Sequence, residues 1–456
     1  MRLPFPNLLE TRGGRLFTFF MLYVTEGIPL GFTATAIATQ MRRQGLSPIA
    51  IGAFVGSLYL PWAFKWIAGP FVDTITSDRF GRKRTWIFAM QLGMMATLLI
   101  ALPINYTTQI GLFSVIILIH NAFCATQDVA IDALAVNVLQ ESERGTANGF
   151  MFAGASIGQL VGGSLVLFLA SVVPFRTTYF FVIGMIALVT IFIVLPLKEP
   201  KGEPRPKLAD SRLAAIGKEL KAFLKETWIA FTGSRGAMIG LAYAILPAGS
   251  YALGLALQSN VAVELGLNDS QVGQLAAITT AISAVGCVVG GALSDKFGRR
   301  KTLGFFLTLT AVPTLYLAYS MFGAHWIHAI APNAANRPVP PASLVTVFWV
   351  TCIVYNAFQG LYYGIQSALF MDITTPKVAA TQFTAYMAML NLTISYTAVW
   401  QGWAIEKLGY PATLTLDAAL GMIGVILLPF LKPQRKPKPF AEETAPGTAI
   451  PEGVVP

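Results

Sequence analysis

Cysteine and histidine are scarce in this chain of 456 residues, which contains three of each. All three cysteines lie in apolar runs (Cys124, Cys287 and Cys352), so they predict neither a disulfide framework nor a metal site. The histidines form no visible metal-ligating cluster and no Ser-His-Asp arrangement (His120, His325 and His328). An enzyme is therefore the least supported class, and we expect no metal and no cofactor.

Charge is also scarce: charged residues make up 12% of the chain and hydrophobic residues 55%, with a mean hydropathy of +0.62. One soluble core could not bury that much apolar surface, so the composition predicts a protein of the lipid bilayer. The net charge of +10 comes with basic residues in short loops between apolar runs, where anionic headgroups explain them without nucleic acid. No Gly-x-x-x-x-Gly-Lys-Ser/Thr loop occurs, which argues for an ion gradient rather than ATP as the energy source.

Twelve apolar runs are long enough to cross a membrane, and they predict an all-α integral membrane protein of 12 helices in two six-helix halves. The first six runs are 16–40, 47–71, 86–104, 109–134, 146–172 and 177–197. The second six are 236–259, 270–293, 302–323, 343–369, 378–403 and 411–431. Glycines four residues apart within these runs predict close helix packing (Gly27 and Gly31, Gly52 and Gly56, Gly286 and Gly290).

We therefore expect an N-terminal half at 1–197, a cytoplasmic linker at 198–235, a C-terminal half at 236–431 and a disordered cytoplasmic tail at 432–456. Apolar residues in the linker recur near helical spacing between lysines, which predicts an amphipathic helix on the membrane surface (Ile216, Leu220, Phe223 and Leu224 among them).

Of the 32 Lys and Arg residues, five fall outside, Lys65 lies within a span, and the other 26 fall in the predicted cytoplasmic segments (outside: Arg42, Arg43, Arg176, Arg337 and Lys407). This bias predicts that both termini are cytoplasmic. The adjacent Arg42 and Arg43 conflict with the rule, and the sequence offers no explanation for them.

A short polar motif recurs at matched positions of the two halves. The second copy runs from Gly291 to Leu303, and the first is Gly69 to Asp73 followed by Asp78 to Arg84. Glycines allow a tight reversal and basic residues keep the loop cytoplasmic. Asp73 and Asp295 lie just inside each turn, where a carboxylate can accept hydrogen bonds from a helix N-terminus or pair with a loop arginine. The motif resembles the signature loop of the major facilitator superfamily.

Four ionisable residues lie within predicted spans: Glu26, Lys65, Asp128 and Asp132. A charge near mid-bilayer costs roughly 2.5 to 3.5 kcal/mol on insertion scales, so such groups need partners or water. The i, i+4 spacing puts both aspartates on one helix face, where like charges favour proton uptake unless Lys65 neutralises one of them. This is the chemistry of a proton-coupled carrier. A purely structural ion pair of Lys65 with one aspartate is the alternative, and Asp132 could instead belong to a gate.

The corresponding region of the second half has Gln366 and Asp372 in place of the aspartate pair. We therefore expect coupling in the first half and substrate contacts in the second, although the polar and aromatic residues there could equally be packing residues (Gln359, Tyr362, Tyr363 and Gln366).

Five motifs in the first half resemble the AmpG muropeptide permease and acetyl-CoA transporter family: residues 26–33, 64–73, 80–86, 125–133 and 143–145. The resemblance implies proton-driven import of anhydromuropeptides, meaning N-acetylglucosamine linked to anhydro-N-acetylmuramic acid with or without peptide, across a bacterial inner membrane by a monomer. It implies a transport role for Lys65, Asp128 and Asp132, and a gating role for a second set (Asp73, Arg82, Arg144, Asp295 and Arg299). A same-family carrier of another anion such as acyl-CoA, and a general sugar or drug transporter, remain open.

Overall fold

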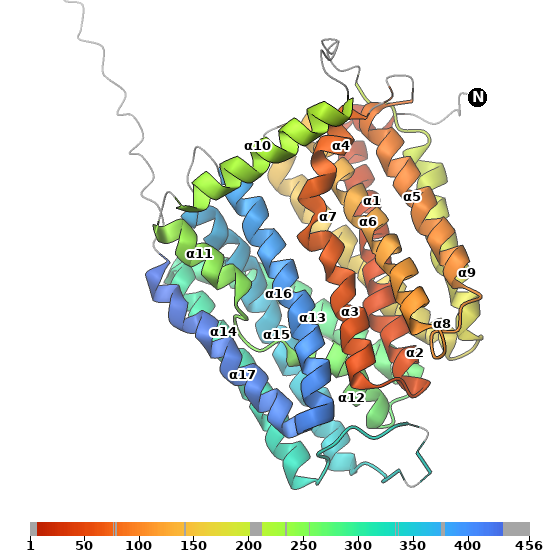
Figure 1. Cartoon of the computed structure of the whole chain (residues 1–456), viewed down its shortest axis with the longest axis vertical. Coiled ribbons are helices and arrows are strands. Elements are labelled where there is room, and N and C mark those ends of the chain that lie inside the picture. Colours follow the sequence, from red (N-terminus) through yellow and green to blue (C-terminus); the bar gives the residue numbers. More distant parts are fainter. Residues whose placement is uncertain are drawn as a thin grey trace, which may run out of the picture.

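The chain folds into long, roughly parallel helices in a computed structural model (Figure 1). It describes residues 7–75, 77, 80–140, 143–200, 212–232, 235–254, 256–332, 334–335, 337–374 and 379–431, and every regular element in these ranges is helical. The predicted tail at 432–456 lies outside them. One helix, α10 (Arg212–Thr232), runs across one end of the others instead of alongside them.

The first six predicted spans are all present. They correspond to α1 (Arg12–Leu30) with η2 (Gly31–Ile37) and α2 (Ala38–Arg43); α3 (Pro48–Ala63) with η3 (Lys65–Ile67) and α4 (Ala68–Thr74); α5 (Arg82–Ala101); α6 (Ile110–Val138); α7 (Arg144–Gln159) with η5 (Leu160–Leu165) and α8 (Val166–Ala170); and α9 (Phe175–Val189) with η6 (Thr190–Val194). Local chemistry sets the starts of two of them. Thr11 accepts from the Gly14 N–H, and Ser47, just before Pro48, accepts from the Ala50 N–H, as N-cap residues do.

The second half contains α11 (Arg235–Ile245), η7 (Ala252–Gly254), α12 (Ala256–Glu264), α13 (Asp269–Phe297), α14 (Arg299–Gly323), α15 (Ala342–Ile373), α16 (Ala379–Leu408) and α17 (Tyr410–Leu427). Within the described residues, ten helices are long and apolar enough to span a membrane. The other two predicted spans are the run at 236–259, which the chain interrupts between α11 and α12, and α16, which has 30 residues and buries several polar side chains.

Small residues let the two halves approach closely where α3 packs on α16. A Cβ atom added at Gly52 would lie 2.5 Å from the Ala398 carbonyl oxygen, and one at Gly56 would lie 2.6 Å from that of Ser395. Only glycine permits this approach, which confirms the expected role of the Gly52 and Gly56 pair. The Ser395 hydroxyl also donates to the Gly56 carbonyl at 2.7 Å, joining the halves directly.

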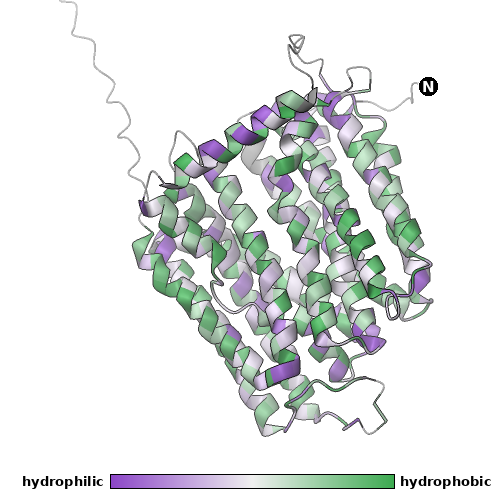
Figure 2. Cartoon of the chain, in the orientation of Figure 1, coloured by the Kyte–Doolittle hydropathy of each residue, from purple (hydrophilic) through white to green (hydrophobic). Residues whose placement is uncertain are grey.

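The sides of the helices are largely apolar (Figure 2). Large side chains there are well exposed, such as Phe152 at 65%, Val288 at 76% and Tyr319 at 75%. Such apolar surfaces are stable in contact with lipid, which agrees with the membrane protein that the composition predicted.

Candidate functional site

An ion pair inside the first half joins the second and fourth spans. The second span contains Pro61, leaves the α-helix at Phe64 and makes one 3-10 turn, η3, that begins at Lys65. The Lys65 ammonium donates to Oδ2 of Asp128 on α6 at 2.5 Å and lies 5.8 Å from the centre of the Trp62 ring. The Asp128 side chain is 4% exposed and that of Lys65 is 27% exposed, so protein atoms cover the lysine less completely than its partner.

The other two predicted carboxylates lie in the same cluster. The Tyr23 hydroxyl of α1 donates to Oδ1 of Asp132 at 2.6 Å. Glu26, also on α1, has Asp128, Lys65 and Asp132 as its charged neighbours. Its Oε2 is buried and has no hydrogen-bond partner within the part of the chain that the structure describes. The structure thus brings all four predicted ionisable residues together, three carboxyl groups around one lysine.

Neutral polar groups, which the sequence did not single out, hold the cluster in place. Thr25 accepts hydrogen bonds from Gln91 of α5 at 3.2 Å and from Gln127 of α6 at 3.1 Å. Because Gln127 directly precedes Asp128, this bond fixes the register of α6 against α1. The signal was present in the sequence, since a glutamine in an apolar run also needs a partner.

The first span stays helical after Glu26, even though a proline follows three residues later. Pro29 lies inside α1, and the helix continues as the wider π-helix η2. Such local widening is frequent at functional sites and leaves the helix continuous through the membrane.

In the second half, α15 presents its polar residues on two faces. Tyr362 is 2% exposed, and Gln366 is buried and donates to the Tyr243 hydroxyl at 3.3 Å, so both lie in the core of that half. Tyr363 is 46% exposed and has Glu26 and Lys65 of the first half among its charged neighbours. Gln359, one turn earlier on the same face, lies beside Gly254. Gln359 and Tyr363 therefore occupy the face of α15 that looks toward the charged cluster.

Some of the residues predicted to form a cytoplasmic gate have described contacts. In each of these contacts the partner lies in the same half of the chain. Lys83 of α5 forms an ion pair with Asp73, and Arg82 begins α5. Arg299 donates to Oδ1 of Asp372 at 2.6 Å. The side chains of Arg144 and Asp295 lie outside the described residues. Close by, Arg15 forms an ion pair with Glu143 at 2.6 Å, and this hydrogen bond lowers the pKa of the Glu143 carboxyl.

A carboxylate does sit on a helix N-terminus at this end, but it is Glu199. Its two oxygens accept from the backbone N–H groups of Lys83, at 3.1 Å, and Arg84 at the start of α5. The partial positive charge of the helix start favours an anion there. The sequence analysis expected Asp73 or Asp295 to accept hydrogen bonds from a helix N-terminus. It did not identify Glu199, which lies in the linker, 116 residues after Lys83.

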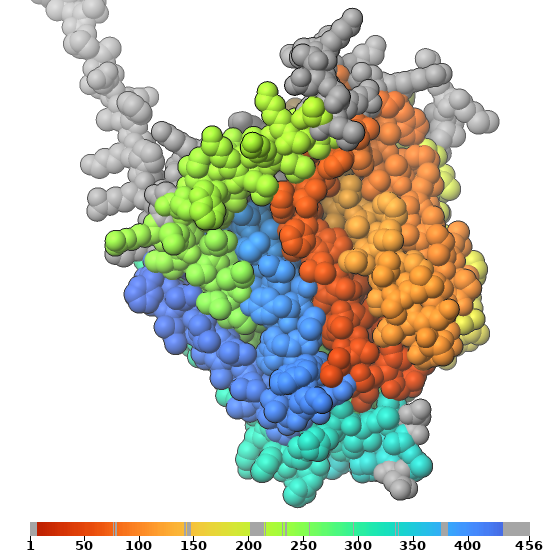
Figure 3. Space-filling model, in the orientation of Figure 1, coloured from red at the N-terminus to blue at the C-terminus, as the bar shows by residue number. Residues whose placement is uncertain are grey.

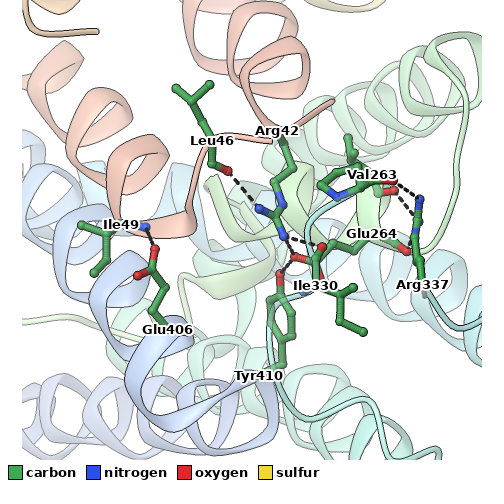
Figure 4. Close-up of polar contacts among 10 residues, drawn as sticks. Arg42, Leu46, Ile49, Val263, Glu264, Ile330, Arg337, Glu406 and Tyr410 are labelled. Atoms are coloured by element: carbon green, nitrogen blue, oxygen red, sulfur yellow. Dashed lines mark hydrogen bonds and ion pairs between the residues drawn. The ribbon is translucent and has the colours of Figure 1, made fainter. Parts of the chain in front are cut away.

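The opposite end carries residues 38–49 and is predicted to face away from the cytoplasm; we call it the outer end. There Arg42 of α2 forms an ion pair with Glu264 of α12 (Figure 4). The Arg42 and Glu264 side chains are 2% and 0% exposed. Arg42 also donates to the carbonyl oxygens of Leu46 and Ile330, each at 2.9 Å, and Glu264 accepts from the Tyr410 hydroxyl and the Ile330 N–H.

Further polar contacts surround this pair. Arg43 forms an ion pair with Asp269, which also accepts from Gln40 at 2.8 Å. The Ile49 N–H donates to Glu406 at 3.1 Å (Figure 4). We call Arg42, Arg43, Glu264, Asp269 and Tyr410 the outer lock. Two ion pairs between described residues join one half to the other, and both belong to the outer lock: Arg42 with Glu264 and Arg43 with Asp269. The outer lock explains why Arg42 and Arg43 depart from the expected charge distribution.

One more buried carboxylate was missed by sequence reasoning. Asp417 of α17, which is 2% exposed, accepts from the Ser250 hydroxyl, from the N–H groups of Tyr251 and Ala252 at 2.9 and 3.0 Å, and from Gln401 at 2.7 Å. Ser250, Tyr251 and Ala252 lie where the seventh span is interrupted between α11 and α12, and Gln401 lies on α16. Asp417 thus satisfies backbone groups that a broken helix would leave unpaired inside a membrane.

Two bundles of membrane helices, a charged cluster between helices of one bundle and an ion-paired contact at one end of the interface match the architecture of a multi-pass secondary transporter. The family model for the Major Facilitator Superfamily matches residues 16–247 and 239–455, and the chain belongs to that superfamily.

Individual relatives narrow the comparison. The chain is 24% identical over 424 residues to the anhydromuropeptide permease of Escherichia coli K12, covering 90% of this chain and 78% of the relative. It is 22% identical over 431 residues to the putative transporter AmpG 4 of Rickettsia conorii, covering 91% and 96%. Among solved structures, the xylose transporter XylE from E. coli superposes with a TM-score of 0.66 at 13% identity, covering 93% and 99%. The nucleoside transporter NupG gives 0.59 at 14% identity, covering 91% and 98%. These structures confirm the all-α major facilitator fold.

Proposed function

We propose that this protein is a proton-coupled importer of anhydromuropeptides in a bacterial inner membrane, acting as a monomer with both termini in the cytoplasm. The observation that carries the proposal is the cluster of Glu26, Asp128 and Asp132 around Lys65 inside the first half. Intramembrane ionisable groups of this kind are typical of proton pathways. The named E. coli relative supports the substrate class.

The chemistry of the cluster suggests how a proton and a substrate exchange. When a carboxyl group of the cluster takes up a proton, its hold on Lys65 weakens, because the attraction between the two charges disappears. The lysine then becomes available to the lactyl or peptide carboxylate of an anhydromuropeptide. Proton release restores the ion pair with Asp128 and expels the anion, so each cycle couples the two movements.

The second half would supply the contacts to the neutral part of the substrate. Tyr363 is exposed and has the charged cluster among its neighbours, and aromatic rings suit the apolar faces of sugars. Gln359 on the same face offers an amide to hydroxyl and acetamido groups. Tyr362 and Gln366 would join these contacts only in a conformation that exposes them.

Opening and closing would then occur at the two ends in turn. The outer lock holds the halves together at one end. We place Asp73, Arg82, Arg144, Asp295 and Arg299 in the opposing cytoplasmic gate, which forms when the outer lock is broken.

The test is uptake of labelled GlcNAc-anhydroMurNAc into vesicles that contain the purified protein, with and without an inwardly directed proton gradient. Accumulation above the equilibrium level only with the gradient is the expected result. An acyl-CoA and a neutral disaccharide serve as competing substrates in the same assay. Uptake of either in preference to the anhydromuropeptide, or uptake indifferent to the gradient, would overturn the proposal.

A further inference from the structure

The helix α10 lies across one end of the molecule and touches both halves (Figures 1 and 3). One of its sides faces the protein. On that side Ile216 and Phe231 are 3% and 5% exposed. The Phe223 ring stacks on Trp66 of η3 with 5.1 Å between ring centres, and Phe231 packs edge-on against Tyr386 of α16 at 5.3 Å.

The depth of α10 follows from its contact with Trp66. That residue lies eight positions before Thr74, where α4 ends, and a helix rises about 1.5 Å per residue. Phe223 therefore contacts a residue about 12 Å before the end of the second span, as measured along its axis. α10 therefore lies level with the last turns of the second span, a position that suits an amphipathic helix of the membrane interface.

The outward side of α10 has the pattern of an interfacial helix. Leu224 is 53% exposed, Trp228 is 72% exposed, and Lys218, Lys221 and Lys225 are exposed as well. At about 100° per residue, Leu224 and Trp228 adjoin the protein-facing side and the three lysines follow next around the helix. The acidic residues Glu219 and Glu226 lie on the other flank. None of the three lysines has an ion-pair partner in the part of the chain that the structure describes.

We propose that α10 binds the anionic lipid headgroups of the leaflet at this end of the protein. Trp228 and Leu224 enter the acyl-chain boundary, and Lys218, Lys221 and Lys225 pair with lipid phosphates. The charge of the lysine flank selects anionic over zwitterionic lipid, and the exposed tryptophan is a residue type that prefers the membrane interface.

The contact with Trp66 gives this lipid surface a role in transport, in a step that rests on the proposed function. Trp66 directly follows Lys65 in η3, so the stack with Phe223 holds the turn that presents Lys65 to Asp128. Anionic lipid that fixes α10 would thereby stabilise the position of Lys65, and loss of that lipid would loosen it.

The lipid surface is tested with the full-length protein in vesicles that contain either brominated phosphatidylglycerol or brominated phosphatidylcholine at equal mole fraction. Subtracting the signal of Trp228→Phe isolates the fluorescence of Trp228. We expect Trp228 to be quenched by both lipids and to report about a 5-fold or greater local enrichment of the anionic one. Replacing the lysines together (Lys218→Gln, Lys221→Gln and Lys225→Gln) should remove the enrichment.

The matched control replaces charges on the opposite flank, Glu219→Gln with Glu226→Gln, and should leave the enrichment unchanged. Equal quenching by the two lipids, or enrichment that survives the lysine substitutions, would overturn the proposal. The link to transport is read separately: anhydromuropeptide uptake by the unaltered protein should fall several-fold in purely zwitterionic vesicles. Enrichment without that fall refutes the link to Lys65, whereas absence of uptake in all vesicles refutes the proposed function and leaves the quenching result standing.

Discussion

At the scale of single residues, Lys65 is the centre of the proposed chemistry. It is the one cation of the cluster, its partner Asp128 is nearly inaccessible, and Glu26 keeps a buried oxygen without a partner among the described residues. A buried carboxyl oxygen without a donor carries a desolvation cost that no hydrogen bond offsets. The cluster therefore combines a carboxylate paired with Lys65 and a second carboxyl group, that of Glu26, with one oxygen left without a partner among the described residues, which is the combination that the proposed proton exchange needs.

Our first prediction concerns Asp128→Asn. The substitution removes the ion pair, so Lys65 stays free for the substrate anion whether or not a proton is present. Accumulation driven by a pH gradient should be abolished, while exchange of substrate without a gradient persists in the same vesicles. Lys65→Ala should instead weaken binding of carboxylate- or phosphate-bearing substrates by about 10-fold or more and scarcely affect a neutral disaccharide.

Thermal unfolding and the control Glu406→Gln, which removes a carboxylate outside the cluster, separate coupling from folding. If Asp128→Asn still concentrates substrate in response to a pH difference, the proton site lies elsewhere. Glu26→Gln and Asp132→Asn are then the next variants to measure.

At the scale of elements, the breaks in the helices are where function concentrates. η3 presents Lys65, η2 widens the first span just after Glu26, and the interruption before α12 is stabilised by Asp417. The outer lock also joins element ends, those of α2, α12 and α17. Because Arg42 and Glu264 are buried, removing one partner leaves the other charge without compensation in a closed outer end.

Our second prediction is that Glu264→Gln shifts the conformational equilibrium toward an open outer end. A cost of about 3 kcal/mol for the unpaired Arg42 corresponds to roughly a 100-fold change in population. The readout is Ser395→Cys, placed at the contact between the halves, in a background without the three native cysteines. Its reaction with an impermeant thiol reagent from the outer side should become faster.

The double variant Arg42→Gln with Glu264→Gln leaves no unpaired charge at this site and should restore slow labelling. Glu406→Gln, which removes a carboxylate whose hydrogen bond among the described residues is to the Ile49 N–H at the same end, should change the rate little. Equal labelling rates in Glu264→Gln and the unaltered protein would show that the outer lock does not set the equilibrium.

At the scale of the whole molecule, the distribution of basic residues sets the expected orientation. The outer lock accounts for Arg42 and Arg43, since both are paired with acidic residues of the other half. Arg337, another basic residue on that side, donates to the backbone carbonyl groups of Val263 and Glu264. Three of the five basic residues at the outer end are therefore committed to contacts between elements, and the remaining bias still favours cytoplasmic termini.

Our third prediction is that both repeated loops face the cytoplasm. Cysteines placed by Arg82→Cys or Arg300→Cys should not react with an impermeant reagent added to intact cells, yet should react in inside-out vesicles. Lys407→Cys, on an exposed residue of the outer end, is the opposite control and should react in intact cells. Labelling of Arg82→Cys or Arg300→Cys from outside would reverse the topology.

Much of the fold was predictable from local information. Apolar runs of about 20 residues report the spans, because a helix must satisfy its own backbone in lipid, and the predicted limits lie close to those observed. The interrupted seventh span was the exception: we predicted an unbroken run at 236–259 although it contains Pro247, Gly249 and Ser250, and the break is stabilised by Asp417, which lies 165 residues away from Ala252. No local pattern announces such a partner.

The candidate site also has a part that the sequence predicts and a part that only the structure reveals. Glu26, Lys65, Asp128 and Asp132 were recognised because a charge within an apolar run is conspicuous in any sequence, and the i, i+4 spacing of the aspartates fixes their common face. The outer lock could not be recognised: Arg42 stood out as an exception to the charge rule, but its partner Glu264 is 222 residues away, between two predicted spans, where an acidic residue is unremarkable. Burial and pairing across the two halves make these ordinary residues significant, and both properties arise only when the halves pack together.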